Sequence, residues 1–174
     1  LLLAVNQMPV VSMNDTSICA GDPAVTFDAG PGFTTYTWES GEASQSIQKD
    51  AAGIYIVDFV DANSCAGSDT VELTINALPV PDLGLDQTIC DGAGAVSFTP
   101  GNFDTYVWSS TETTGSISKS VAGIYEVEVT DTKLCSATDE VELIVIDLPN
   151  PDVILGGPMC PGMSQTLDAS IYDN

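Results

Sequence analysis

The sequence predicts an all-β protein made of tandem antiparallel β-sandwich modules of about 70 residues each. Three observations lead to this prediction. The sequence repeats itself with a regular period. Short runs that alternate apolar and polar residues are separated by Gly, Pro, Asn and Asp, which favour turns. No stretch shows the periodicity of an amphipathic helix.

Self-comparison defines the period. Trp38 matches Trp108, and Cys65 matches Cys135, with the same spacing for both pairs. Residues 52–55 read Ala-Gly-Ile-Tyr and recur unchanged at 122–125. The first cysteines of successive repeats, Cys19, Cys90 and Cys160, follow this spacing to within a single position.

The period sets the expected module limits. Residues 1–8 are read as the end of a preceding repeat, 9–78 and 79–148 as two complete repeats, and 149–174 as the start of a further, truncated repeat. A unit of this length can hold its own core, so each repeat is expected to be a domain and not one rung of a solenoid.

The strands follow from the alternating runs. Within the first complete repeat, we expect strands at residues 24–28, 35–38, 46–48, 54–60 and 70–75. In the last of these runs, Val71, Leu73 and Ile75 lie on one face, and the residues between them are polar. A period of two with one apolar face is typical of an antiparallel sheet with one side in water. Six or seven such strands, spaced by turns, predict an immunoglobulin-like sandwich.

Aromatic residues recur at positions that suggest structural roles. Trp38 and Trp108 are expected to be core anchors on a central strand, and a binding role is the alternative. Tyr55 and Tyr125 each follow a glycine at the start of a strand, where a corner or core tyrosine is expected and a ligand contact is the alternative.

Composition limits the functions to consider. The chain carries 25 acidic residues and three basic ones, with no histidine, for a net charge of −22. We expect no nucleic-acid binding, because phosphate contacts require Lys and Arg. We expect no membrane insertion, because no apolar run approaches the roughly 20 residues of a spanning helix. Histidine, the commonest general acid or base, is missing, and no nucleophile–base pair is recognisable, so we expect no enzymatic activity.

Each complete repeat contains two cysteines, Cys19 with Cys65 and Cys90 with Cys135. We favour a disulfide within each repeat, because a loop of about 46 residues would contribute roughly 3–4 kcal/mol and let a small module fold alone. Bonds between neighbours, Cys65–Cys90 and Cys135–Cys160, fit the period equally well. In the favoured scheme, the partner of Cys160 lies outside the given sequence. Stable disulfides imply an oxidising, extracellular compartment.

Oxygen ligation of a hard cation is the metal chemistry that this composition allows. Asp82 and Asp86, near a module junction, could hold calcium together with Asp61 or Asp131 from turns. Solvated acids on an acidic surface are the favoured interpretation, and calcium ligation is the side hypothesis.

The motifs of both repeats resemble a known repeat type over essentially the whole chain. They occupy residues 16–22, 36–38, 52–55 and 61–65 in the first repeat, and 86–92, 106–109, 122–127, 130–131 and 135 in the second. The series resembles the Ig-like or PKD-like repeats of very large surface proteins of Bacteroidota. Such proteins are typically exported by the type IX secretion system, and many are gliding-motility adhesins or carry a gliding-associated C-terminal domain. The resemblance therefore implies a cell-surface location.

Two modifications are also considered. Asp69-Thr70-Val71 resembles the O-glycosylation motif of Bacteroidota, which would make Thr70 an acceptor. Lys49 and Lys119 occupy matching positions, so an intramolecular isopeptide bond is weighed against simple exposed lysines.

We expect the chain to be a stalk or fibre segment of a bacterial surface adhesin or filament. The linkers 78–82 and 148–152 contain two prolines each and should resist bending. Expected partners are neighbouring repeats, and like chains in a fibre or a surface glycan or protein. The alternative is a glycan- or protein-binding module, which would display exposed aromatic residues on loops. Phe33 and Phe103 are the candidates, although a buried role is favoured for both.

Overall fold

The computed structural model describes residues 6–148, and its regular secondary structure is entirely β-strand. This confirms the expected all-β, immunoglobulin-like sandwich. The described range contains no helix that could cross a membrane. Residues 1–5 of the first partial repeat, and all of 149–174 with Cys160, lie outside the described residues.

Six strands form each complete repeat, and each strand of the first repeat has a counterpart in the second. The strands of the first repeat are β1 (Thr16–Cys19), β2 (Val25–Asp28), β3 (Thr35–Trp38), β4 (Ser46–Lys49), β5 (Gly53–Val60) and β6 (Ala66–Asn76). The strands of the second are β7 (Gln87–Cys90), β8 (Val96–Phe98), β9 (Thr105–Trp108), β10 (Ile117–Lys119), β11 (Gly123–Thr130) and β12 (Ser136–Ile146).

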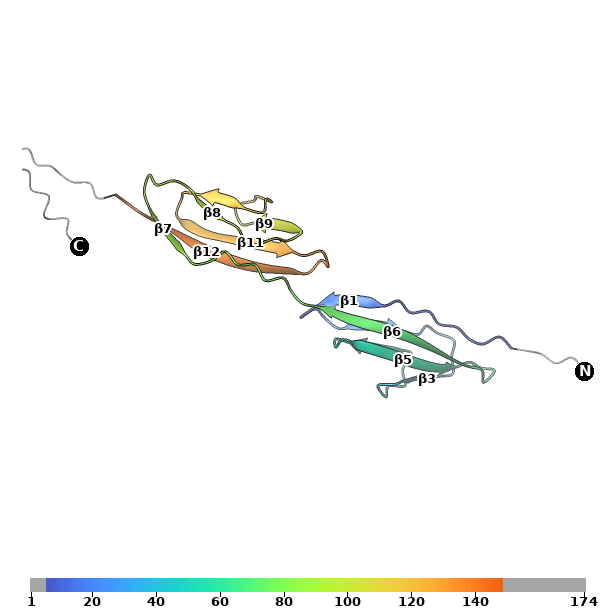
Figure 1. Ribbon diagram of the computed structural model, residues 1–174. Helices are drawn as coiled ribbons and strands as arrows, with labels where there is room; N and C mark the ends of the chain where they lie inside the picture. Colours follow the sequence, from blue (N-terminus) through green and yellow to red (C-terminus); the bar gives the residue numbers. More distant parts are fainter. Residues whose placement is uncertain (1–5, 149–174) are drawn as a thin grey trace, which may run out of the picture. The chain divides into compact units, whose positions relative to one another are not determined.

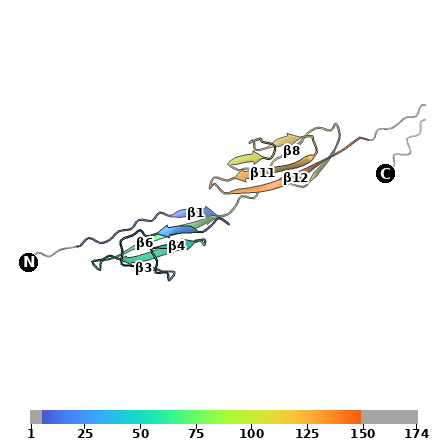
Figure 2. The same cartoon turned by 180° about the vertical axis from the view of Figure 1, so that it is seen from behind.

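Each repeat is a sandwich of a four-stranded and a two-stranded sheet. The larger sheet of the first repeat has the order β1-β6-β5-β3, and the smaller one pairs β2 with β4. The second repeat has the same arrangement, with β7-β12-β11-β9 and β10-β8. Figure 1 shows the larger sheet of the first repeat, and Figure 2 shows β4 from behind.

The first strand of each repeat departs from the expected antiparallel pattern. β1 runs parallel to β6, with Thr16 opposite Leu73 and Cys19 opposite Asn76. β7 pairs with β12 in the same way. We did not expect a strand here, because Thr-Ser-Ile-Cys shows no clear alternation. β6 also begins earlier than expected, because its polar first residues pair with the end of β5, where Ala66 lies opposite Val60.

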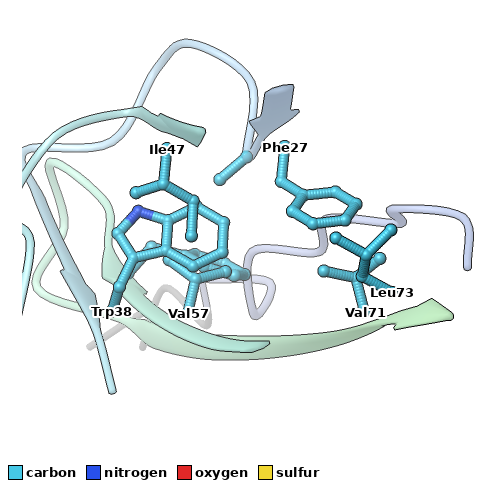
Figure 3. Packing of buried hydrophobic residues seen from close by; sticks show 8 residues of the cluster. Phe27, Trp38, Ile47, Val57, Val71 and Leu73 are labelled. Carbon is cyan, nitrogen blue, oxygen red and sulfur yellow. The ribbon is translucent and has the colours of Figure 1, made fainter. Parts of the chain in front are cut away.

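The core of the first repeat lies between its two sheets (Figure 3). Trp38 lies beside Ile47 and above Val57, and Phe27 from β2 faces Val71 and Leu73. All of these side chains are buried, and most of their neighbours along the strands are exposed. The second repeat buries the matching positions Phe98, Trp108, Ile117, Val127, Val129, Val141 and Leu143. Because aromatic side chains bury the most area, the tryptophan of each repeat is a major part of a small core.

The described chain separates into two compact units. The first extends to Pro81 and includes Phe103–Thr105 and Glu128–Thr138, and the second begins at Asp82 and holds the rest. One boundary between the units falls within the proline-containing linker 78–82, and the others fall inside the second repeat. The module limits 9–78 and 79–148 remain predictions.

Candidate functional site

The two cysteines of a repeat lie at opposite ends of one long strand. Cys19 ends β1 opposite Asn76, the last residue of β6, whereas Cys65 directly precedes β6. At 3.3 Å per residue, the eleven steps from residue 65 to 76 span about 36 Å. A disulfide requires Cα atoms within about 7 Å of each other. The favoured Cys19–Cys65 bond is therefore incompatible with this fold.

The second repeat leads to the same correction. Cys90 lies opposite Ile146, at the end of β12, and Cys135 directly precedes that strand. The favoured Cys90–Cys135 bond would have to span the same length of strand.

The structure contains a different bond, Cys19–Cys135, with Cα atoms 5.6 Å apart and a sequence separation of 116. It joins the first cysteine of one repeat to the second cysteine of the next, and both residues belong to the first compact unit. Cys65 and Cys90 are free thiols, so the alternative Cys65–Cys90 bond is absent too. Periodicity could not distinguish these pairings, because it does not say at which end of the sandwich a cysteine lies.

A tight turn between β11 and β12 positions Cys135. Asp131 Oδ1 accepts hydrogen bonds from the backbone N–H groups of Lys133 (2.8 Å) and Cys135 (3.0 Å). The Asp131 N–H donates to the Cys135 carbonyl at 2.9 Å. Leu134 adopts φ of 67°, a left-handed conformation that the turn requires. The cysteine side chain is thus held on a fixed backbone.

The turn between β5 and β6 repeats this arrangement around Cys65. Asp61 Oδ1 accepts from the N–H groups of Asn63 and Cys65, both at 2.8 Å, and the Asp61 N–H donates to the Cys65 carbonyl at 3.0 Å. Ser64 has φ of 64°. The free thiol of Cys65 is therefore held by the same hydrogen bonds as the bonded Cys135.

The carboxylates proposed as calcium ligands are engaged with backbone N–H groups. Asp61 and Asp131 stabilise the turns just described. Asp82 Oδ1 accepts from the Gly84 N–H, and Asp86 Oδ1 accepts from that of Glu142, both at 2.9 Å. Over residues 6–148, no group of three or more acidic or cysteine side chains is arranged to hold a metal ion. The structure therefore does not bring these four acids together as a site.

Sequence reasoning missed a repeated pair of structural aspartates. In the first repeat, Asp69 Oδ2 accepts from the Met13 N–H at 2.7 Å, and Asp15 Oδ1 accepts from the Glu72 N–H at 2.9 Å. In the second repeat, Asp139 accepts a hydrogen bond from the Leu83 N–H, and Asp86 accepts one from the Glu142 N–H. These bonds tie the segment before the first strand to the last strand. The matching spacing of the acids was the available signal.

In each repeat, the matching tryptophan, tyrosine and lysine make a set of hydrogen bonds and a cation–ring contact, which we call the brace. Trp38 Nε1–H donates to the Ser44 carbonyl at 2.9 Å. Tyr55 Oη donates to the Ala51 carbonyl at 2.7 Å, as a corner tyrosine does. Lys49 Nζ lies 5.3 Å from the centre of the Tyr55 ring. The second repeat repeats these contacts with Trp108, Thr114, Tyr125, Val121 and Lys119.

The lysines of the brace form ion pairs. Lys49 Nζ lies 2.6 Å from Glu42 Oε1, and Lys119 Nζ lies 2.5 Å from Glu112 Oε1. The hydrogen bond from Lys49 lowers the pKa of Glu42 to about 2, and Lys119 acts likewise on Glu112. The lysine side chains are only 17% and 19% exposed. An ion pair thus occurs where an isopeptide bond or an exposed lysine was considered.

The residues considered for ligand binding and for modification do not form a common site in the described part of the chain. Phe33 is half-buried, with its ring centre 4.4 Å from that of Phe59, and Phe103 is half-buried as well. Neither is the exposed loop aromatic that a binding module would display. Thr70 is exposed on β6, so its glycosylation remains a prediction.

Comparisons with known proteins concern the fold. No family model and no curated protein matches the chain. Similar solved structures include a titin I-band fragment, I67–I69 (13% identity, TM-score 0.43, 79% of this chain and 64% of that one). Murine CEACAM1b (12%, 0.36, 75% and 96%) and the N-terminal four Ig domains of Dscam1 isoform 8.4 (14%, 0.34, 82% and 46%) are also similar. The chain thus spans about half of the Dscam1 fragment. Likenesses at these TM-scores carry no argument about function.

Proposed function

We propose that this chain is a load-bearing segment of an extracellular stalk, as in a bacterial surface adhesin or filament. The Cys19–Cys135 bond carries the proposal, because it joins two successive repeats covalently. Such a bond couples modules mechanically, and a disulfide persists in an oxidising, extracellular compartment. The net charge of −22 supports the same role, because it keeps a long repeat protein soluble. The resemblance to Bacteroidota surface repeats is the basis for the bacterial assignment.

The disulfide determines which part of the chain would bear a load. A pull on the two ends of the described range would run from residue 6 to Cys19, cross the sulfur atoms to Cys135, and leave through residue 148. The residues between the two cysteines would be bypassed. At about 3.5 Å per extended residue, the sequence separation of 116 corresponds to about 400 Å of chain that cannot extend while the bond is intact.

Single-molecule force spectroscopy on the chain tethered at both ends tests this proposal. The oxidised chain should lengthen only by its short flanking segments. After reduction, unfolding of both repeats should add about 400 Å of contour length. The double variant Cys65→Ser, Cys90→Ser is the matched control and should behave as the parent does. Equal extension before and after reduction would contradict a covalent load path.

A further inference from the structure

Two free thiols remain in the described chain, Cys65 and Cys90. We propose that they are linking cysteines, which extend the Cys19–Cys135 pattern to further repeats of the same kind. Cys90 would bond to the second cysteine of a repeat that follows, and Cys65 to the first cysteine of a repeat that precedes. This inference goes beyond the stalk function, because it states a pairing rule for every repeat.

Sequence equivalence is the first observation behind the proposal. Cys90 holds the place in the second repeat that Cys19 holds in the first, and Cys65 holds the place in the first that Cys135 holds in the second. Those two equivalents, Cys19 and Cys135, are bonded to each other in the structure. The free thiols are therefore one first cysteine and one second cysteine of a repeat. Each occupies a position that forms a disulfide in the other repeat.

Local geometry is the second observation. Cys65 is held by the same aspartate turn as Cys135. Beyond Cys90, the Asp91 N–H donates to the Ile146 carbonyl at 2.8 Å, just as the Ala20 N–H after Cys19 donates to the Asn76 carbonyl at 2.8 Å. Both free thiols thus have the backbone setting of a bonded counterpart.

The exposure of Cys65 and Cys90 agrees with two thiols that lack a disulfide partner. The bonded Cys135 is 1% exposed, whereas its equivalent Cys65 is half-buried. The bonded Cys19 is half-buried, whereas its equivalent Cys90 is exposed. Each free cysteine is therefore more accessible than its bonded counterpart.

Strand length excludes a partner in the same repeat. Cys65 and Cys19 are separated by about 36 Å of β6, and Cys90 and Cys135 by the same length of β12. A disulfide at Cys65 or Cys90 must therefore come from another repeat.

The chemistry requires an oxidant, for which a small-molecule disulfide suffices. The Cys90 thiolate attacks one sulfur of that disulfide and releases one thiol. The partner cysteine, as thiolate, then displaces the second thiol from the mixed disulfide. Two protein thiols become one disulfide and lose two protons, while the oxidant gains two electrons and leaves as two thiols.

Disulfide mapping of a lengthened chain tests the pairing rule. A second copy of residues 79–148 is inserted after residue 148, with Thr88→Ser and Lys133→Arg in the copy as mass labels and with Cys160→Ser in the chain. Both labelled side chains are exposed. The protein is oxidised with glutathione disulfide, alkylated, and cleaved before aspartate without reduction, so that each cysteine lies on its own peptide.

The expected product links unlabelled peptide 86–90 to labelled peptide 131–138. The link between peptide 15–21 and unlabelled peptide 131–138 should persist, and it shows that the parent fold is intact. Cys90→Ser in the unlabelled repeat should leave labelled Cys135 alkylated. Alkylation of Cys90 in the unlabelled repeat, or a link from that cysteine to peptide 61–68 of the same chain, would overturn the proposal. Either result is independent of the force experiment, which depends only on Cys19–Cys135.

A second measurement does not depend on folding of the inserted copy. The Cys65→Ser and Cys90→Ser variants of the original chain, both with Cys160→Ser, are oxidised separately and as a mixture. A covalent dimer should form only in the mixture, through Cys90 of one chain and Cys65 of the other. Dimers formed equally by either variant alone, or no dimer in the mixture, would refute complementary pairing.

Discussion

Gly67 and Phe59 form a size-matched pair that can be tested by mutation. They lie opposite each other on β6 and β5. A methyl group on Gly67 would lie 2.4 Å from Phe59 Cε2 and 2.7 Å from the Pro9 carbonyl oxygen, closer than real atoms approach. The second repeat has Ala137 and Val129 at these positions, so a larger residue on β12 accompanies a smaller one on β11. Glycine in the first repeat therefore makes room for the phenylalanine ring.

The size of the effect follows from packing. Gly67→Ala should lower the free energy of unfolding by about 1–3 kcal/mol, as overpacking in a dense core does. Phe59 is 1% exposed, so Phe59→Val alone should cost roughly 2–3 kcal/mol through lost burial and a residual cavity. The double variant recreates the pair of the second repeat. We expect it to cost less than the sum of the single changes by about 1–2 kcal/mol.

Native-state hydrogen exchange of the β5 and β6 amides measures these free energies within the first repeat. Ala137→Gly is the matched control in the second repeat, where no large ring requires space, and it should cost only about 0.5–1 kcal/mol. If the double variant costs the sum of the single changes to within about 0.3 kcal/mol, the two residues are not coupled and the packing argument fails.

Three further predictions concern the disulfide and the brace. Cys19→Ser should lower the free energy of unfolding by about 5 kcal/mol on the chain-entropy model for a sequence separation of 116, whereas Cys65→Ser should change it little; chemical denaturation without reductant compares them. The folded-state pKa of Glu42, at about 2, lies below its usual 4.5, so the stability that its ion pair contributes should be present above pH 4.5 and lost as pH falls towards 2. Melting temperatures across this range should show a smaller acid-induced loss for Glu42→Gln than for the parent. Tyr55→Phe removes a 2.7 Å hydrogen bond and should cost about 0.5–1.5 kcal/mol in urea denaturation.

The fold was predictable because its strong signals are local. The alternation of Val71, Leu73 and Ile75 reflects one buried face, and the repeated tryptophans reflect one core position per repeat. β1 was not predictable in this way, because a short edge strand needs little apolar patterning. Its parallel pairing with β6 depends on tertiary contacts that a single sequence does not display.

The candidate site was harder to predict for a geometric reason. The sequence shows that Cys19 and Cys65 recur with the period, but their separation depends on β1 lying beside the far end of β6. Once that strand is placed, the bond within a repeat is excluded by length alone. Asp61 and Asp131 were recognised as acids in turns, but nothing local in the sequence distinguishes a carboxylate that caps a turn from one that is solvated.

The parallel pairing of β1 with β6 also affects how a repeat would yield once the disulfide is cut. Traction on the two termini of the repeat draws β1 towards its amino end and β6 towards its carboxyl end, so the two strands are sheared past each other. The hydrogen bonds between residues 16–19 and 73–76 then share the strain and must rupture together, whereas a hairpin pulled open loses its bonds one after another. Reduction would therefore transfer the load to a shear clamp in each repeat, giving the chain a second, weaker level of resistance.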